Sequence, residues 1–191
     1  MAGRKMSCIA AMSSKNRGIG KDGKLPWRLR SEMKYFTRIT TDVKQEGQQN
    51  AVIMGRKTWE SIPAKYLPLS GRLNVILSRT MSDAPENVLL CTDLQKALEV
   101  LSNPPYDQSI EHVYITGGYG VYKEAMSMPN LHRIYLTEVH MDVECDAFYP
   151  EFDKEDFNIV SDPNVPSEMQ EEKGVKFQYF VYEKKNQVCD Q

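Results

Sequence analysis

The sequence contains no closely spaced pair of cysteines and no pair of histidines at the spacing of a metal site. Its four cysteines, Cys8, Cys91, Cys145 and Cys189, are scattered, and two of them lie in apolar runs typical of buried strands. Its three histidines form no H-E-x-x-H or similar pattern. We therefore expect reduced thiols without disulfides, no metal site, and a cytoplasmic protein.

The sequence also has little excess charge and no long hydrophobic run. It has 24 Lys and Arg against 26 Asp and Glu, a formal net charge of −2, so overall electrostatics do not favour a nucleic-acid partner. No run approaches the roughly 18 apolar residues of a membrane-spanning helix, so no membrane partner is expected. The apolar residues 6–12 follow Arg4 and Lys5 as in a weak signal peptide, but we expect them to form a buried first strand.

The chain of 191 residues, 41% hydrophobic and 26% charged, is typical of one globular domain, which we take as residues 1–191. Strand-like and helical patterns alternate along it. Strands are expected at 6–12, 51–54, 73–77, 88–91, 113–116, 134–139, 157–160 and 176–183, and helices at 29–40, 57–61, 93–101 and 121–126. The alternation predicts an α/β fold, with a mostly parallel sheet flanked by helices and an antiparallel C-terminal edge strand. The polar residues 162–174 are expected to form a loop. Thr92 or Asp93 can cap the N-terminus of the helix expected at 93–101.

Glu32 is a carboxylate on the apolar face of the predicted helix 29–40. At roughly 100° per residue, it falls on the side where Leu29, Met33, Phe36 and Ile39 gather. Burial there should raise its pKa, since no basic residue shares the face. We interpret Glu32 as a functional acid. The alternative is a helix that rolls or ends early, so that Glu32 reaches water.

Three predicted strands end in glycine, hydroxyl or basic residues, at 55–58, 78–80 and 117–120. The carboxyl ends of parallel strands lie along one rim, where α/β proteins bind ligands. Glycines let a phosphate approach the backbone, and Arg56 and Arg79 add positive charge. This pattern indicates a phosphorylated ligand, although a glycine after a strand is often only a turn. After the later strands the standard motifs are incomplete: Gly118-Tyr119-Gly120 lacks the third glycine of G-x-G-x-x-G, and Val52 stands where a P-loop needs its first glycine. No G-x-S-x-G motif of a hydrolase is present.

The polar, glycine-rich loop 13–27 ends in Leu25-Pro26-Trp27, directly before the helix that carries Glu32. We interpret it as a mobile flap that excludes water from a reaction site. The alternative is a surface Ω-loop with its tryptophan in the core.

Together these motifs closely resemble those of the dihydrofolate reductase family, of the animal, monofunctional type, over residues 8–184. The motifs are Gly18-Ile19-Gly20-Lys21, Leu25-Pro26-Trp27, the run from Val52 to Trp59, Leu77-Ser78-Arg79, Gly117-Gly118 with Val121-Tyr122, and Gln170-Glu171-Glu172-Lys173-Gly174. The resemblance implies an eight-stranded sheet and a monomer. It also implies the reduction of 7,8-dihydrofolate to tetrahydrofolate by NADPH, within one-carbon metabolism, and binding of folate and antifolates.

The resemblance also implies roles for individual residues. Glu32 would hold the pterin and support protonation of its N5, with Trp27 and Thr137 in the catalytic set, and Arg72 would bind the folate α-carboxylate. The folate site would comprise Ile9, Leu25, Glu32, Met33, Phe36, Thr37, Ile62, Leu69, Arg72 and Thr137. The NADPH site would comprise Ala11, Gly18, Ile19, Gly20, Lys21, Asp22, Gly23, Lys24, Arg56, Lys57, Thr58, Ser78, Arg79, Thr80, Gly117, Gly118, Tyr119, Gly120, Val121, Tyr122, Lys123 and Glu124. A cis peptide between Gly117 and Gly118 is also implied.

Some positions depart from the vertebrate pattern of the family. Met33 replaces an aromatic residue, Thr37 a glutamine and Tyr66 an asparagine, and Arg28 stands in place of two prolines. These departures leave the ranking of antifolates open.

Two other functions remain as alternatives. One is a pyrimidine reductase of riboflavin synthesis, which shares the fold but does not need Leu25-Pro26-Trp27 together with Glu32. The other is an inactive folate- or nucleotide-binding module, which the retention of Glu32 and Gly117-Gly118 disfavours.

Overall fold

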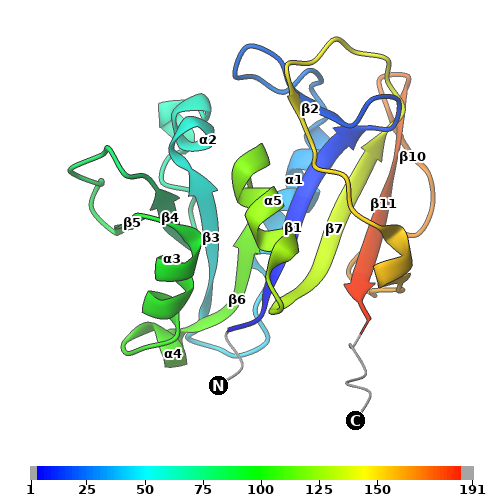
Figure 1. Cartoon of the computed structure of the whole chain (residues 1–191). Coiled ribbons are helices and arrows are strands. Elements are labelled where there is room, and N and C mark those ends of the chain that lie inside the picture. Colours follow the sequence, from blue (N-terminus) through cyan, green and yellow to red (C-terminus); the bar gives the residue numbers. More distant parts are fainter. Residues whose placement is uncertain (1–3, 186–191) are drawn as a thin grey trace.

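A twisted β-sheet runs through the middle of the computed structural model, which describes residues 4–185 (Figure 1). Within this range the main sheet has nine strands, of which eight follow the order β10-β11-β7-β1-β6-β3-β4-β5 and the ninth, β9, pairs with β11. The strands are β1 Met6–Ser13, β3 Gln49–Gly55, β4 Arg72–Leu77, β5 Val88–Cys91, β6 Ile110–Ile115, β7 Leu131–Val139, β9 Phe157–Ile159, β10 Gln170–Glu172 and β11 Val175–Lys184. A separate small sheet joins β2 Gly18–Gly20 to β8 Ala147–Phe148.

The six strands from β7 to β5 are parallel, whereas β9, β10 and β11 are antiparallel to their neighbours. This arrangement confirms the predicted α/β class and its antiparallel C-terminal ribbon. β11 lies one strand inside the edge, because the short β9 and β10 cover parts of its outer side. The expected loop 162–174 therefore contains a strand, β10, which is too short and too polar to show a strand pattern in the sequence.

Side chains of alternate residues build two cores, one on each face of the sheet. On β1, Cys8, Ala10 and Met12 pack into one core and Ile9 into the other, as the two-residue period of a strand requires. One face of β11 carries Lys176, Gln178, Phe180 and Tyr182, and of these Tyr182 is only 2% exposed. The ring of Phe152 packs edge-on against Tyr182, with centroids 5.3 Å apart, and covers that face.

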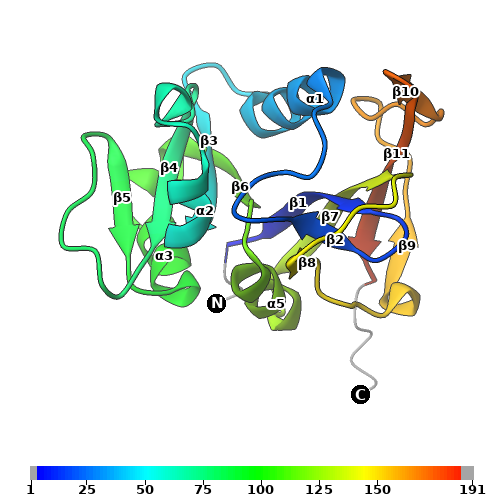
Figure 2. The same cartoon turned by 90° about the horizontal axis from the view of Figure 1, so that it is seen from above.

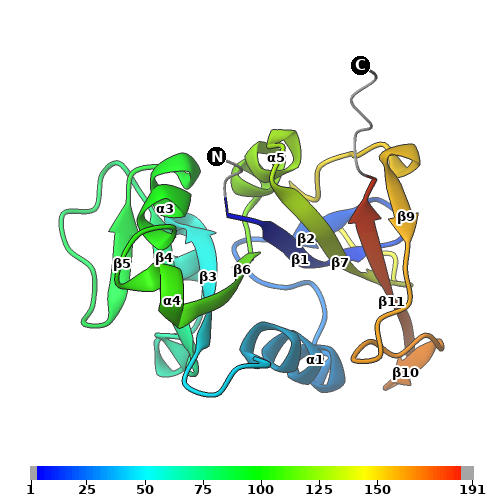
Figure 3. The same ribbon diagram turned by 90° about the horizontal axis from the view of Figure 1, so that it is seen from below.

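Helices cover both faces of the sheet. α1 lies on one face, and α3 and α5 lie on the other (Figures 2 and 3). The helices are α1 Arg30–Thr41, α2 Arg56–Ser61, α3 Leu94–Leu101, α4 Tyr106–Ser109 and α5 Tyr119–Ser127, with 3-10 turns η1 Ala64–Tyr66 and η2 Lys154–Asp156. Asp93 caps α3 by accepting a hydrogen bond from the Lys96 N–H at 2.8 Å, as one of the two expected capping residues. In the part of the chain that the structure describes, no helix has the length and apolar character needed to cross a bilayer.

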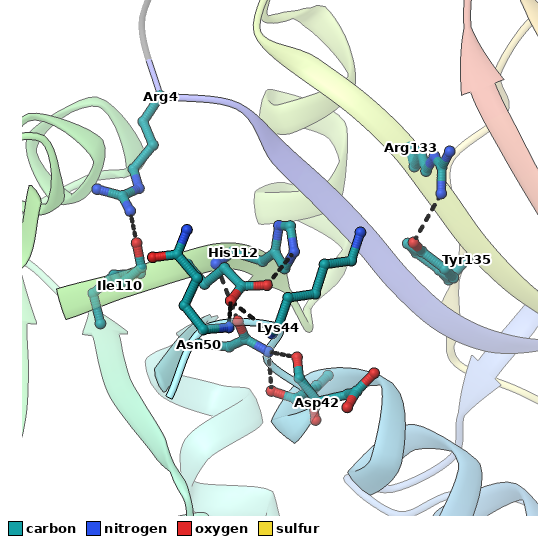
Figure 4. Close-up of polar contacts among 11 residues, drawn as sticks. Arg4, Asp42, Lys44, Asn50, Ile110, His112, Arg133 and Tyr135 are labelled. Atoms are coloured by element: carbon teal, nitrogen blue, oxygen red, sulfur yellow. Dashed lines mark hydrogen bonds and ion pairs between the residues drawn. The ribbon is translucent and has the colours of Figure 1, made fainter. Parts of the chain in front are cut away.

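The C-terminal end of α1 is tied to the sheet by Asn50, a fully buried residue of β3 (Figure 4). Its amide nitrogen donates to the carbonyls of Thr40, at 3.1 Å, and Asp42, at 2.8 Å, and its oxygen accepts from the His112 N–H at 3.0 Å. Carbonyls at a helix end have no partner within the helix, and Asn50 supplies one from the sheet.

The cysteines agree with the expectation of reduced thiols as far as the structure describes them. Cys8 and Cys91 are buried and free, and Cys145 is free and half-buried. Cys189 lies outside the described residues.

Candidate active site

Glu32 is buried under the first turn of α1 and is only 6% exposed. The Thr137 hydroxyl of β7 donates to Glu32 Oε1 at 3.2 Å, and within residues 4–185 the carboxylate has no cationic partner. Burial raises the pKa of Glu32 to about 7 from an ordinary 4.5, although the Thr137 hydrogen bond acts in the opposite direction. Glu32 therefore does not reach water by an early helix end, and its proton is poised near neutral pH.

The buried face of α1 is rotated relative to the face expected from the sequence. Its buried residues are Glu32, Tyr35, Ile39 and Thr40, whereas Met33 is 46% exposed. Tyr35 stacks on Tyr179 of β11 with ring centroids 3.9 Å apart, and this contact sets the roll of the helix. The prediction that Met33 belongs to the buried stripe was wrong, since it lies about 100° from Glu32 around the helix axis.

The sheet beneath Glu32 presents two rows of side chains from adjacent strands. Ala11, Thr137 and Tyr179 are paired across β1, β7 and β11, and the row of Ile9 and Tyr135 lies beside them. Side chains two residues apart point to the same face, so both rows lie on the α1 side. Three residues that the resemblance implicates, Ile9, Ala11 and Thr137, are thus brought together.

Four further residues of the expected folate site are not fully buried, and three of them pack against the same core. Phe36, Ile62 and Leu69 are half-buried and pack against it, and Leu25 is 50% exposed. Trp27 is buried, and its indole N–H has no hydrogen-bond partner among residues 4–185. Thr37 is exposed on α1. An apolar strip with one buried donor suits a planar ligand that has polar edges.

Arg72 begins β4 and is 8% exposed, so it is not the solvated surface charge that usually follows a turn. Its Nε donates to the Ser70 carbonyl at 2.9 Å, and its Nη1 donates to the Thr40 hydroxyl at 2.8 Å. That hydroxyl donates in turn to the Phe36 carbonyl at 2.7 Å. Burial lowers the pKa of Arg72, and no carboxylate within residues 4–185 pairs with it. The guanidinium is therefore held in place with capacity to bind an anion.

The glycine-rich rim is assembled from the ends of β3 and β6. The Gly55 N–H donates to the Gly117 carbonyl at 2.8 Å, and a cis peptide joins Gly117 to Gly118, as the resemblance implied. A Cβ on Gly118 would come within 3.3 Å of the Thr58 hydroxyl. Gly118 stands at the N-cap of α5 and supplies no side-chain cap, so the first-turn N–H groups of α5 are candidates to bind an anion.

The remaining residues of the expected NADPH site differ in exposure. Arg56, Lys57, Arg79 and Thr80 are exposed at the rim, as are Tyr119, Gly120, Lys123 and Glu124 on α5. Ser78 accepts hydrogen bonds from the N–H groups of Thr80 and Met81, which shapes the turn after β4. Val121 is half-buried, and Tyr122 is buried with its hydroxyl donating to the Ile9 carbonyl at 2.8 Å. Tyr122 therefore supports the site by holding the backbone of β1 at Ile9.

The loop after β1 forms a short hairpin, residues 18–24, closed by mutual backbone hydrogen bonds of 2.9 Å between Lys21 and Lys24. β2 pairs with β8, Lys21 Nζ lies 2.8 Å from the Glu144 carboxylate, and the Asp22 N–H donates to Asp146 at 2.8 Å. Asp22 and Gly23 have positive φ and form its tip. The expected residues Gly18, Ile19, Gly20 and Lys24 all lie in this hairpin, which is tied to residues 144–148.

Comparison with known proteins decides the family. A family model described as dihydrofolate reductase matches residues 5–184. The dihydrofolate reductase of Aedes albopictus is 49% identical over 95% of this chain and 98% of its own length, and that of Bos taurus is 47% identical over 96% and 99%. The chain belongs to the dihydrofolate reductase family. It is therefore an enzyme of the oxidoreductase class, and the resemblance stated from its motifs is confirmed.

A solved structure supports the same assignment. The dihydrofolate reductase of Schistosoma mansoni superposes with a TM-score of 0.86 and 36% identity, covering 96% of this chain and 100% of that one. Within the family fold, the sequence did not reveal three residues that shape the site, namely Tyr35, Thr40 and Tyr179. Each acts through a partner on another element, so no local pattern marks it.

Proposed function

We propose that this protein reduces 7,8-dihydrofolate to 5,6,7,8-tetrahydrofolate with NADPH as cofactor. Membership of the dihydrofolate reductase family supports the reaction. The residue assignment rests on the buried carboxyl of Glu32, which has one hydroxyl donor and, among residues 4–185, no cation beside it. Such a group suits a ligand edge rich in N–H donors.

Glu32 would bind the pterin and support a proton at its N5. The ionised carboxylate accepts two or more N–H hydrogen bonds, which would orient the ring and favour its protonated form. A pKa of about 7 keeps both protonation states of Glu32 accessible at neutral pH, as efficient acid–base support requires. Thr137 keeps the carboxylate oriented, and Trp27 offers its buried indole N–H to a ligand or a bridging water.

Arg72 would bind the carboxylate at the other end of the substrate. Glu32 lies in the first turn of α1, and Thr40, which holds Arg72, lies in its last turn. At 1.5 Å per residue the two positions are about 12 Å apart along the axis. This separation suits an elongated ligand with N–H donors at one end and an anion at the other, lying along the strip of Phe36, Ile62 and Leu69.

The glycine rim fits NADPH, which supplies the hydride for the reduction. Gly117, Gly118 and the start of α5 would hold its pyrophosphate, since glycine stands at the N-cap of α5 and the first turn offers backbone N–H groups. The exposed Arg56 and Arg79, with Ser78, would bind the 2′-phosphate. The hairpin that contains Gly18–Gly20 would cover the reacting rings and exclude water.

We further propose that the protein acts as a cytoplasmic monomer and that residues 1–191 form one domain. The residues expected to bind folate and NADPH all come from this one chain, so catalysis by this reading requires no second copy.

A steady-state assay tests the proposal. NADPH absorbance should fall only when dihydrofolate is added, and the product should be tetrahydrofolate. NADPH oxidation that does not depend on dihydrofolate, in protein shown to be folded, would contradict the assignment. Replacing dihydrofolate by an aminated pyrimidine would detect the alternative reductase activity.

A further inference from the structure

The N-terminus of α1 has no cap from its own sequence. Leu29 stands at the N-cap position and has no side-chain acceptor. Glu32, three residues later, could fold back onto the first turn as glutamates at this position often do, but its carboxylate is turned inward to Thr137. The N–H groups of Arg30 and Ser31 therefore need an acceptor from elsewhere.

Glu172 of β10 supplies that acceptor from the sheet. Its Oε1 accepts from the Arg30 N–H at 2.9 Å, and its Oε2 accepts from the Ser31 N–H at 2.8 Å and from the Ser31 hydroxyl at 2.5 Å. These hydrogen bonds hold the pKa of Glu172 at about 2. An anion at this end of the helix also interacts favourably with the helix dipole.

The position of Glu172 is set by a tight hairpin. Glu172 pairs with Val175, and the two residues between them, Lys173 and Gly174, both have positive φ, as in a type I′ turn. β10 is hydrogen-bonded to β11, and β11 to β7, which carries Thr137. The sheet thus holds the backbone of the first turn of α1 through Glu172 and the carboxylate of Glu32 through Thr137. β10 and α1 lie side by side in both views along the sheet (Figures 2 and 3).

We propose that Glu172 is a positioning residue for Glu32: it replaces the missing cap of α1, so that Glu32 is free to turn inward and stays buried in the geometry that catalysis needs. This inference rests on the proposed role of Glu32. Without Glu172, Glu32 is the nearest carboxylate that can cap its own helix, and it would rotate outward towards the first-turn N–H groups. It would then lose its burial and the Thr137 contact.

The charges around both carboxylates are known from the structure. Tyr35 on α1, Tyr179 on β11 and Tyr122 on α5 experience the charge of Glu32, and Thr137 on β7 donates to it. Glu172 interacts with the Arg30 and Ser31 donors, the charge of Lys173 lowers its pKa, and its own charge raises the pKa of Tyr179. The pKa of Glu32 is set mainly by its burial and by the Thr137 hydrogen bond, so a fall in that pKa beyond the one seen with Glu171→Ala reports rotation or exposure of Glu32.

The experiment compares Glu172→Ala and Glu172→Gln with Glu171→Ala in the full chain. Glu171 is the exposed neighbour on β10 and makes no side-chain hydrogen bond within the described range, so it controls for loss of one negative charge at this edge. The carboxyl pKa of Glu32 is read by NMR in protein labelled with ¹³C-glutamate and assigned with Glu32→Gln. The pH profile of kcat is measured in parallel, and thermal unfolding confirms that each variant is folded.

We expect Glu172→Ala to move the pKa of Glu32 down from about 7 towards 4.5 and to reduce kcat at pH 8 by roughly tenfold, less than the 10²–10⁴ loss expected on removing Glu32 itself. Glu172→Gln should give a smaller change in the same direction, and Glu171→Ala should match the parent protein. If Glu172→Ala does not fold, Glu172→Gln carries the test. An unchanged Glu32 pKa in a folded Glu172 variant overturns the inference. A shifted pKa with an unchanged kcat profile supports the positioning role and instead contradicts the catalytic role of Glu32.

Discussion

Glu32 and Arg72 are side chains of opposite charge that are buried without a charged partner in the described part of the chain. An unpaired buried charge is destabilising, so both positions are held by surrounding contacts rather than chosen for stability. A ligand with N–H donors at one end and a carboxylate at the other would compensate both. The first two predictions test the role of Glu32 and the role of Arg72 separately.

Glu32→Gln should keep the fold and lose about 10²–10⁴ in kcat at neutral pH. The amide preserves size and hydrogen bonding, but it carries no negative charge to favour a protonated pterin. Activity should partly recover in acid, where solvent protonates the substrate. A pH profile of kcat from pH 5 to 9 checks this, and a profile identical to that of the parent protein would remove Glu32 from the mechanism.

Arg72→Leu should weaken the binding of dihydrofolate and methotrexate, which carry a glutamate. It should leave unchanged the binding of diaminopyrimidine inhibitors, which lack one. Loss of one partner of a desolvated ion pair costs about 2–5 kcal/mol, or roughly 30- to several-thousand-fold in Kd. Arg72→Lys should restore little of the affinity for these glutamate-bearing ligands, because a single ammonium cannot form the paired hydrogen bonds of a guanidinium. Calorimetric titration of both inhibitor classes distinguishes ligand binding from support of β4, since equal losses would indicate support alone.

At the scale of elements, α1 is fixed at both ends by side chains from the sheet, and three strand ends form the rim. Glu172 holds its N-terminus, and Asn50 holds its C-terminus (Figure 4). Helix ends expose backbone groups without partners, so these side chains determine where the helix starts and stops on the sheet.

Asn50→Ala should lower the free energy of unfolding by about 3 kcal/mol, because it removes three hydrogen bonds and leaves the buried Thr40 carbonyl without this partner, together with the partly buried Asp42 carbonyl and His112 N–H. Gln48→Ala is the matched control, since it removes one side-chain hydrogen bond at the surface, to the Gln108 carbonyl, and should cost less than about 1 kcal/mol. Urea unfolding of the two variants gives the comparison, and equal losses would mean that Asn50 does not hold α1.

Arg79→Ala should reduce the preference for NADPH over NADH, mainly by weakening the binding of NADPH. A 2′-phosphate brings about −2 charge, which an exposed arginine at the rim can pair with. The variant's Kd for each cofactor, measured by fluorescence titration, decides the point. A parallel loss of NADH affinity would show that Arg79 does not recognise the additional phosphate.

At the scale of the whole molecule, the buried acid of the active site reduces stability at high pH. The folded-state pKa of Glu32 is about 7 against an ordinary 4.5, so the folded protein binds more protons than the unfolded chain between these values. The stability contributed by the protonated acid is fully present below pH 4.5 and is lost as pH rises through about 7.

Glu32→Gln should therefore be more stable than the parent protein at pH 8, by up to about 3 kcal/mol, and the difference should vanish below about pH 5. Thermal unfolding at pH 5 and pH 8 checks the sign. A variant that is less stable than the parent at pH 8 would show that the carboxylate is better solvated than its burial indicates. Glu172 has the opposite linkage, because its lowered pKa adds stability that is lost as pH falls towards about 2.

The sequence by itself determined the class of fold, most strand positions and the burial of the Glu32 carboxylate. These follow from local periodicity, since runs such as Val52–Met54 are buried on both faces and a carboxylate among apolar positions stands out within a single helix. The cis Gly117–Gly118 peptide and the place of Thr137 in the site came from the family resemblance and not from the residues alone.

Only the tertiary structure decided which distant side chains meet. Thr137 lies 105 residues from Glu32, Thr40 lies 32 from Arg72, and Glu172 lies 141 from Ser31. The sheet order makes these contacts by setting β7 beside β1 and β11 beside β7, and no local pattern encodes that order. The same reason explains the exposed Met33 and the unexpected β10. The roll of a helix and the existence of a three-residue strand depend on the partner that each packs against.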